Sequence, residues 1–227
     1  FEVKINMLVS CSDVLVLHDS LVQNPEPLEV YSETQEVSRS NSQPSKITYC
    51  VFNHNDQIIA CGTDKGSILF FNKNLEKVSN IKDSDFQNTK ITSIIFTSNS
   101  HYIAYSNDKS MVKVFDLKTS KIFMKIKTDE SCAITALSFS NDNKSLLYSS
   151  DKGKIMMTNL MRNPNLNTGT LSGLSSSDSF YNLKPETVVF SNYFQVTCFK
   201  FSPFFNNLIA VGLETGCVKL VDVVSAG

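Results

Sequence analysis

Few residues of this sequence could do chemistry, and they do not form a catalytic pattern. The three histidines, His18, His54 and His101, lie far apart and at different positions of the strands predicted below. No serine stands in a G-x-S-x-G motif. The segment 62–66, GTDKG, lacks the P-loop spacing and is predicted to be a hairpin turn. The sequence therefore predicts a protein that is not an enzyme and holds no cofactor.

The cysteines predict no metal site either. No two of them form a C-x-x-C pair, and the chain has only three histidines, so no zinc site is expected. Most fall inside predicted strands, where a free cysteine acts as a small hydrophobic residue. Because disulfides are scarce in the cytosol, we expect reduced cysteines in a cytoplasmic protein. The six are Cys11, Cys50, Cys61, Cys132, Cys198 and Cys217.

Length and composition predict an ordinary soluble globular protein. The chain has 227 residues, of which 41% are hydrophobic and 19% charged, and its net charge is −1. A charge so close to zero gives no electrostatic reason to bind nucleic acid or an anionic membrane. No apolar run approaches the roughly 18 residues of a membrane span, and the first ten residues lack the pattern of a signal peptide. The start at Phe1, without Met, suggests a fragment.

The chain is organised around a repeated unit, seen most clearly in residues 90–127. Four short runs rich in β-forming residues follow one another there, separated by polar turns such as Asn107–Ser110. Four strands in about 40 residues predict one antiparallel sheet, of the kind that forms a propeller blade.

The same pattern recurs in three other places. Segments 46–71, 133–159 and 195–222 repeat a threonine, a phenylalanine, an acidic residue and a glycine in matching positions. Successive threonines (Thr48, Thr92, Thr135 and Thr197) lie 44, 43 and 62 positions apart, so the last interval is one period plus an insertion. The predicted blades are a partial one at 1–45, then 46–89, 90–132, 133–194 with a loop insertion at 161–185, and 195–227. The polar stretch 20–45 is predicted to be mostly a surface loop.

This repeat resembles the WD40 family over nearly the whole chain. The family's Trp-Asp dipeptide is degraded here, and no tryptophan is present. The Gly-His pair that usually precedes a blade is also missing. The resemblance implies an all-β propeller whose blades are held mainly by apolar packing and ladder hydrogen bonds. The dipeptide appears as His18-Asp19, Phe71-Asn72, Phe115-Asp116, Thr158-Asn159 and Val221-Asp222.

The resemblance also assigns roles to the turns between the middle strands. In WD40 proteins a frequent aspartate there braces the adjoining backbone, a position held here by Asp64, Asp108, Asp151 and Glu214. WD40 propellers bind other proteins through their rims, so exposed residues beside these turns are interaction candidates. The candidates at the turns are Lys65, Asn107, Lys109 and Lys152.

Two further candidates, Phe204 and Phe205, lie in the segment Ser202–Asn206. Two aromatic residues in a simple hairpin turn would be exposed. They either fold back onto the blade or form a patch that faces a partner, and the sequence leaves both alternatives open.

A closed WD40 ring usually has about seven blades in roughly 300 residues, so we count four to five blades of a larger ring. The missing blades would come from the rest of the chain or from a partner, because open sheet edges are normally covered.

Phrases such as VSCSDVLVLHDS and NHNDQIIACG are similar to ones in the centrosomal WD-repeat factor that recruits γ-tubulin ring complexes, although their order differs. That resemblance implies a scaffold that targets γ-tubulin complexes to the centrosome, basal body or spindle. The alternatives are a propeller subunit of a nuclear-pore or vesicle-coat scaffold, or a substrate receptor of a ubiquitin ligase.

Overall fold

A computed structural model of the chain describes residues 7–11, 15–19, 27–31, 45–128, 131–160, 182–183, 187–205 and 207–223. The chain forms two compact units, Phe1–Ile94 and Ile95–Gly227, and each is described by itself. Within the described residues no helix is both long and apolar enough to cross a membrane.

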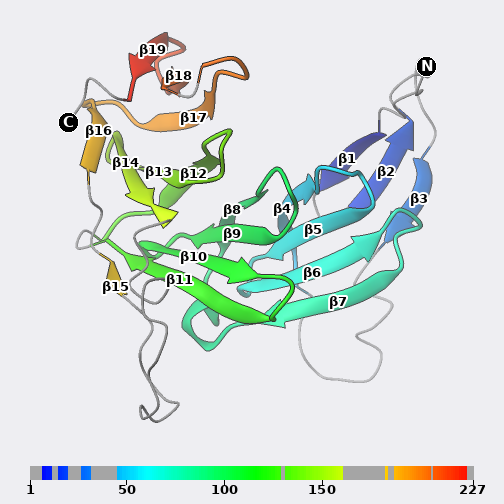
Figure 1. Cartoon of the computed structure of the whole chain (residues 1–227). Helices are drawn as coiled ribbons and strands as arrows, with labels where there is room; N and C mark the ends of the chain where they lie inside the picture. The colour runs from blue at the N-terminus through cyan, green and yellow to red at the C-terminus, as the bar shows by residue number, and fades with distance from the viewer. Residues whose placement is uncertain are drawn as a thin grey trace, which may run out of the picture. The chain divides into compact units, whose positions relative to one another are not determined.

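The first unit contains two antiparallel sheets (Figure 1). In one, β1 (Met7–Cys11), β2 (Leu15–Asp19) and β3 (Pro27–Tyr31) pair in sequence order. In the other, four strands also pair in sequence order, and a short 3-10 helix, η3 (Ser84–Phe86), follows them. These strands are β4 (Ile47–Phe52), β5 (Ile58–Thr63), β6 (Ser67–Asn72) and β7 (Lys77–Lys82).

Three more sheets follow. The boundary between the units falls in β8 (Ile91–Phe96), which belongs to a sheet with β9 (Tyr102–Asn107), β10 (Met111–Asp116) and β11 (Lys121–Lys127). The next sheet consists of β12 (Ile134–Phe139), β13 (Ser145–Ser150), β14 (Lys154–Asn159) and β16 (Thr187–Ser191). The last has three strands, β17 (Val196–Phe201), β18 (Leu208–Leu213) and β19 (Val218–Asp222).

The predicted all-β fold built from repeated antiparallel sheets is confirmed. At the end of the predicted loop insertion 161–185, β15 (Asn182–Leu183) pairs in parallel with β11 and adds a fifth strand to that sheet. The other residues of the insertion, and residues 20–26 and 32–44 of the predicted loop at 20–45, lie outside the described residues.

The core of the second unit lies between neighbouring sheets. Successive side chains of a strand point to opposite faces of its sheet. Leu147 and Ile155, on one face of the β12–β14 sheet, pack in one cluster with Phe199, Ile209 and Val211 of β17 and β18. We call the face that turns toward the following blade the forward face, and the opposite one the backward face.

The opposite face of the same sheet meets the preceding blade in the same way. Leu146 and Tyr148 lie in a cluster with Ala104, Val112 and Val114 of β9 and β10. Each of these faces is apolar, and each is buried only because another sheet stands against it.

The tryptophan slot of the repeat is filled by residues of different size. In the β4–β7 blade the large Phe71 fills the slot and packs in one cluster with the small Cys61 of the second strand. In the β12–β16 blade the sizes are reversed, with the small Thr158 in the slot and the large Tyr148 on the second strand, both fully buried. Burial raises the pKa of the Tyr148 hydroxyl. Blade packing is thus kept without tryptophan.

Three of the four middle turns contain a glycine with positive φ: Gly66 (83°), Gly153 (73°) and Gly216 (80°). Ser110 holds the fourth position with φ 64°. Its buried hydroxyl donates to Cys132 O and accepts from Cys132 N, both at 2.8 Å. This serine therefore anchors its turn with two hydrogen bonds that a glycine could not make.

The glycines at two of these turns allow a clean test of how tightly the turn packs. A Cβ added at Gly66 would collide with Phe86 O, whereas one at Gly216 would meet nothing within 4 Å. We expect Gly216→Ala to cost only the left-handed backbone conformation, about 1–2 kcal/mol of unfolding free energy. Gly66→Ala should cost more, roughly 3 kcal/mol or above, because a backbone carbonyl must move. Urea midpoints measured by circular dichroism check this, and equal losses would contradict it.

Candidate interaction surfaces

Two of the acidic turn residues accept a backbone hydrogen bond from the start of their own blade. Asp64 Oδ1 accepts from Lys46 N at 2.9 Å, and Glu214 Oε1 accepts from Gln195 N at 3.1 Å. Asp108 and Asp151 are exposed at the equivalent turns. For these two the bracing role stays a prediction.

The turn residues named as interaction candidates differ in exposure. Lys109 and Lys152 are exposed, and Lys65 is half-buried. The expectation that Asn107 faces solvent is wrong, because its side chain is fully buried. Its Oδ1 accepts hydrogen bonds from Lys109 N and Met111 N, both at 3.0 Å, so this amide shapes the turn from inside.

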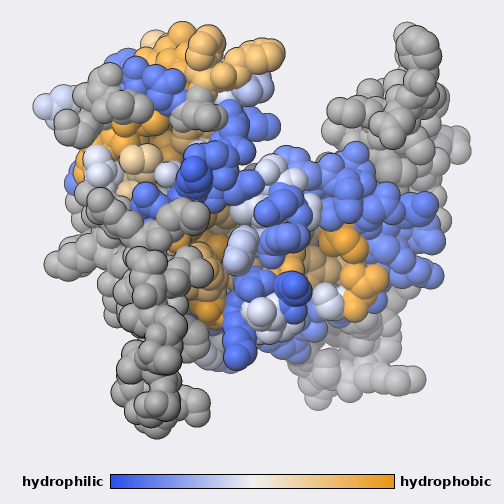
Figure 2. All heavy atoms as spheres, in the orientation of Figure 1, coloured by the Kyte–Doolittle hydropathy of each residue, from blue (hydrophilic) through white to orange (hydrophobic). Residues whose placement is uncertain are grey.

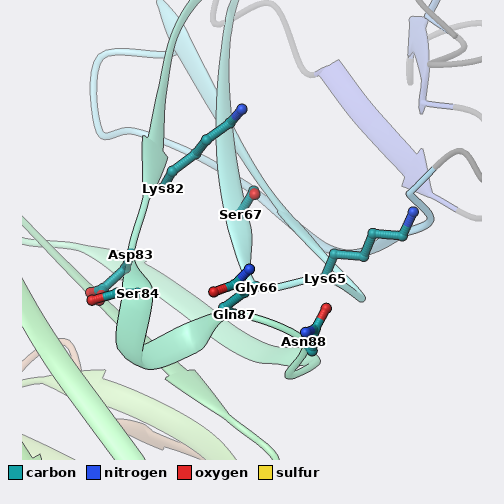
Figure 3. Close-up of a pocket in the computed structure, with 8 residues that line it drawn as sticks. All are labelled: Lys65, Gly66, Ser67, Lys82, Asp83, Ser84, Gln87 and Asn88. Atoms are coloured by element: carbon teal, nitrogen blue, oxygen red, sulfur yellow. The ribbon is translucent and has the colours of Figure 1, made fainter. Parts of the chain in front are cut away.

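Beside Lys65 lies an open cavity of about 420 Å³ in the first unit (Figure 3). It exists because η3 lengthens the connection from β7 to β8, and the buried Phe86 of η3 packs against Gly66. Ligand pockets are usually lined mainly by apolar and aromatic side chains. This lining is polar and includes no aromatic residue, so the cavity gives no case for an apolar ligand. The lining residues are Lys65, Gly66, Ser67, Lys82, Asp83, Ser84, Gln87 and Asn88.

The forward faces of the blades differ strongly in how exposed their apolar residues are. In the β4–β7 blade Ile68 and Phe70 are 1% and 5% exposed, and in the β12–β16 blade Ile155 is fully buried. The matching residues of the last blade, Val218 and Leu220, are 73% and 71% exposed. The last blade thus carries apolar residues where the others do, but nothing in the described chain covers them.

The exposed residues of this face belong to all three strands. The register pairs Cys198 with Gly212 and Gly212 with Val218, and it pairs Lys200 with Ala210 and Ala210 with Leu220. The opposite face of the same sheet carries Phe199, Ile209 and Val211, which are buried. Figure 2 shows apolar residues gathered on the surface over this sheet. We call the exposed side the open face, defined by Cys198, Lys200, Ala210, Gly212, Val218 and Leu220.

The turn between β17 and β18 adds two exposed aromatic residues. Phe204 is 87% and Phe205 60% exposed, so the alternative in which they fold back onto the blade is wrong. Their backbone N–H groups both donate to Ser202 Oγ at 3.3 Å, which holds the turn in shape. The matching turns of the three preceding blades contain only polar residues: 53–57, NHNDQ; 97–101, TSNSH; and 140–144, SNDNK.

Hydrogen bonds tie this turn to its neighbours in the second unit. Asn141 Nδ2 donates to Ser202 O at 2.8 Å, and Ser98 N donates to Asn143 Oδ1 at 3.0 Å. Within the middle turn the Ser140 hydroxyl donates to Asp142 Oδ1 and lowers the pKa of that carboxyl. The three turns therefore form a linked row that ends at the two phenylalanines.

Two of the four repeated threonines, Thr48 and Thr135, form a hydrogen bond to the neighbouring blade. Thr48 and Thr135 are each skipped by the ladder between the first and second strands, so each occupies a β-bulge. Thr48 Oγ1 donates to Ile91 O at 2.7 Å, and Thr135 Oγ1 donates to Val196 O at 2.9 Å. The acceptor belongs in both cases to the inner strand of the next blade.

Thr197 occupies the same bulge in the last blade. Its hydroxyl is exposed and donates to Gly212 O of its own blade at 3.1 Å. The matching bond of Thr48, to Gly62 O, is longer at 3.3 Å, because that hydroxyl is directed to the next blade. Thr197 therefore has the geometry of an inter-blade donor without the neighbouring acceptor.

Sequence reasoning missed Thr197, Val218 and Leu220 as functional residues. Thr197 belongs to the series of threonines whose spacing defines the repeat. Their recurrence at one position of each blade could have indicated a contact between blades. The other two look like core residues, since their equivalents are core residues, and only the structure shows them exposed. Among the residues that the structure describes, no three His, Cys, Asp or Glu side chains are grouped so that they could hold a metal ion.

Repeated antiparallel sheets that stack face against face define a β-propeller of the WD40 type. Residues 33–177 match the model of the Vps8 β-propeller family, and the chain belongs to that family. No curated protein matches the chain by sequence.

Among solved structures, the chain is similar to one in the crystal structure of the mitotic checkpoint complex, with a TM-score of 0.71 at 10% identity. The match covers 98% of this chain and 61% of that one, so this chain spans about three fifths of the length of the protein it matches. At this identity the likeness shows the fold alone.

The threonine contact can be tested within the first unit. We expect Thr48→Val to lower the unfolding free energy by roughly 1–2 kcal/mol, because it leaves Ile91 O without its donor in a partly buried site. Thr197→Val removes only an exposed bond within one blade and should cost about 0.5 kcal/mol or less. Urea midpoints of the two variants compare these losses. A Thr197→Val loss as large as that of Thr48→Val would contradict the inter-blade role.

Proposed function

We propose that this protein is a non-enzymatic β-propeller scaffold that binds other proteins through the open face of its β17–β19 blade. The observation that carries the proposal is the exposure of Val218 and Leu220, at positions that are buried or half-buried in the three preceding blades. Isolated apolar residues on a surface are ordinary, whereas a contiguous patch points to an interaction site.

The composition of the open face fits this role. Fully burying a Val or Leu side chain is worth about 1.5–3 kcal/mol, so Val218 and Leu220 can contribute several kcal/mol to a complex. Phe204 and Phe205 supply exposed aromatic area near one end of the same sheet, and aromatic residues are enriched in protein interfaces. Lys200 is the one charged residue among those that define the face, which fits the low charge of interface cores.

Membership of the Vps8 β-propeller family is compatible with a vesicle-coat scaffold, and we propose that class of assembly. The targeting of γ-tubulin complexes to centrosomes stays a prediction, since neither the family match nor any described feature of the surface favours it. The ubiquitin-ligase alternative likewise stays a prediction.

The test is a pair of lysine substitutions in the open face. We expect Val218→Lys with Leu220→Lys to release the protein from its native assembly, because two charges would be buried without partners. Size-exclusion chromatography of extracts from its source organism, with the protein detected by a tag, measures the shift to a smaller species. The urea midpoint of the isolated variant should stay nearly unchanged, because both side chains are already exposed.

Val78→Lys is the matched control, since Val78 is a half-exposed apolar residue of β7, in the other unit. It should leave the assembly intact. An assembly that survives the double substitution, or that is lost equally in the control, would contradict the proposal.

A further inference from the structure

The polar cavity of the first unit is built by the connection from β7 to β8. This connection has eight residues, 83–90, whereas the one from β11 to β12 has six, 128–133. Its Phe86 is fully buried, and Asn88 N donates to Lys65 O at 3.3 Å, which ties the connection to the turn between β5 and β6. The cavity wall is therefore held in place by the fold, and little ordering is needed when a ligand enters.

Three polar side chains have defined places on this wall. Ser67 is the cross-strand partner of Lys82 in the β6–β7 ladder, so the two side chains lie on one face of the sheet. Ser67 N donates to the Thr63 hydroxyl at 3.0 Å, which fixes the start of β6. Asn88 has a positive φ of 57°, a conformation that asparagine tolerates better than most residues. These side chains are thus positioned without a ligand.

The charges around the cavity favour an anion. Lys65 and Lys82 carry two positive charges, and Asp83 carries the one negative charge of the lining. Asp83 Oδ1 accepts a hydrogen bond from Asp85 N at 3.0 Å, so this carboxylate caps η3. Figure 3 shows its side chain directed away from both lysines. The remaining polar side chains of the lining are ammonium, hydroxyl and amide groups, all of which can donate hydrogen bonds.

Two lysines match the charge of a phosphate monoester. Such a group carries about −1.5 to −2 charges at pH 7, as in a phosphorylated side chain, whereas a carboxylate carries one. Lysine binds phosphate as a point charge on a flexible stem, so the two ammonium groups do not need a rigid fork to reach it. The cavity of about 420 Å³ is as large as ordinary small-molecule sites, which leaves room for more than the phosphate. Ser84 and Gln87 add a hydroxyl and an amide that suit a hydroxylated remainder.

We propose that this cavity binds the phosphate monoester of a small polyol, either free in solution or as the headgroup of a phosphorylated lipid. Lys65 and Lys82 bind the phosphate, and Ser67, Gln87 and Asn88 form hydrogen bonds to the phosphate oxygens and the hydroxyls. The site is independent of the open face, because all of its residues belong to the first unit. The attraction is local, so it does not require a basic chain.

Calorimetric titration of the 227-residue chain with inositol monophosphate tests the site, with inositol as the uncharged reference. We expect inositol to bind at least about tenfold more weakly, because it lacks the charge-assisted hydrogen bonds of the phosphate. The affinity for inositol monophosphate should fall as salt is added. Lys82→Gln should weaken binding about tenfold or more, the loss expected for one hydrogen bond to a charged group.

Two further variants give the controls. Lys73→Gln removes the same charge from an exposed lysine in the β6–β7 turn, at the other end of β7 from Lys82, and should leave binding unchanged. Asn88→Gly keeps the positive φ and removes only the amide, so it should weaken binding about threefold to tenfold. Lys73, Lys82 and Asn88 are exposed, so circular dichroism should show that all three variants fold like the unchanged chain.

Vesicles distinguish the two sources of the ligand. A lipid headgroup is the source if phosphatidylcholine vesicles containing phosphatidylinositol monophosphate retain the chain and Lys82→Gln releases it. Binding of inositol monophosphate without retention on these vesicles identifies a soluble ligand. The inference is overturned if neither form binds at millimolar concentration, if inositol binds as tightly as its phosphate, or if Lys73→Gln weakens binding as much as Lys82→Gln does. None of these results bears on the open face, so the proposed function stands or falls separately.

Discussion

A blade of this protein has two apolar faces, and in the second unit only a neighbouring blade covers them. The β12–β16 blade shows the constraint most clearly, since it has a cluster on each side, one with Val112 and Val114 and the other with Phe199 and Val211. Burial of these faces is the main source of stability in a sheet that lacks the tryptophan of its repeat family. The apolar faces of the blades and their neighbours are therefore parts of one packing arrangement.

Hydrogen bonding makes the contact between blades specific as well as apolar. The threonine lies in a β-bulge, where the ladder between the first two strands skips it. Its hydroxyl donates to a backbone carbonyl of the next blade. This hydrogen bond adds a directional contact to the apolar packing. The last blade keeps the bulge and its threonine although no neighbour is present in the described chain.

Much of the fold could be predicted because the repeat is encoded locally. Alternating apolar residues and turn glycines such as Gly66 and Gly153 fix strands and hairpins from within one blade. Exposure could not be predicted in that way. Leu220 has the same character as the buried Phe70, and its surroundings depend on a neighbour that the sequence pattern does not reveal. Asn107 was misjudged for the opposite reason, since a polar residue beside a turn is usually exposed, and here its amide turns inward to bind two backbone N–H groups.

The central claim is that the open face binds another protein, and amide hydrogen exchange over β17–β19 tests this claim most directly. The measurement compares the isolated 227-residue chain with the protein in its native assembly, using β12–β14 as the internal reference. The account predicts that β19 exchanges much faster than β14 in the isolated chain and becomes strongly protected in the assembly. Equal exchange of β19 in the two states would contradict it, because the face would then be as open in the working protein as it is alone.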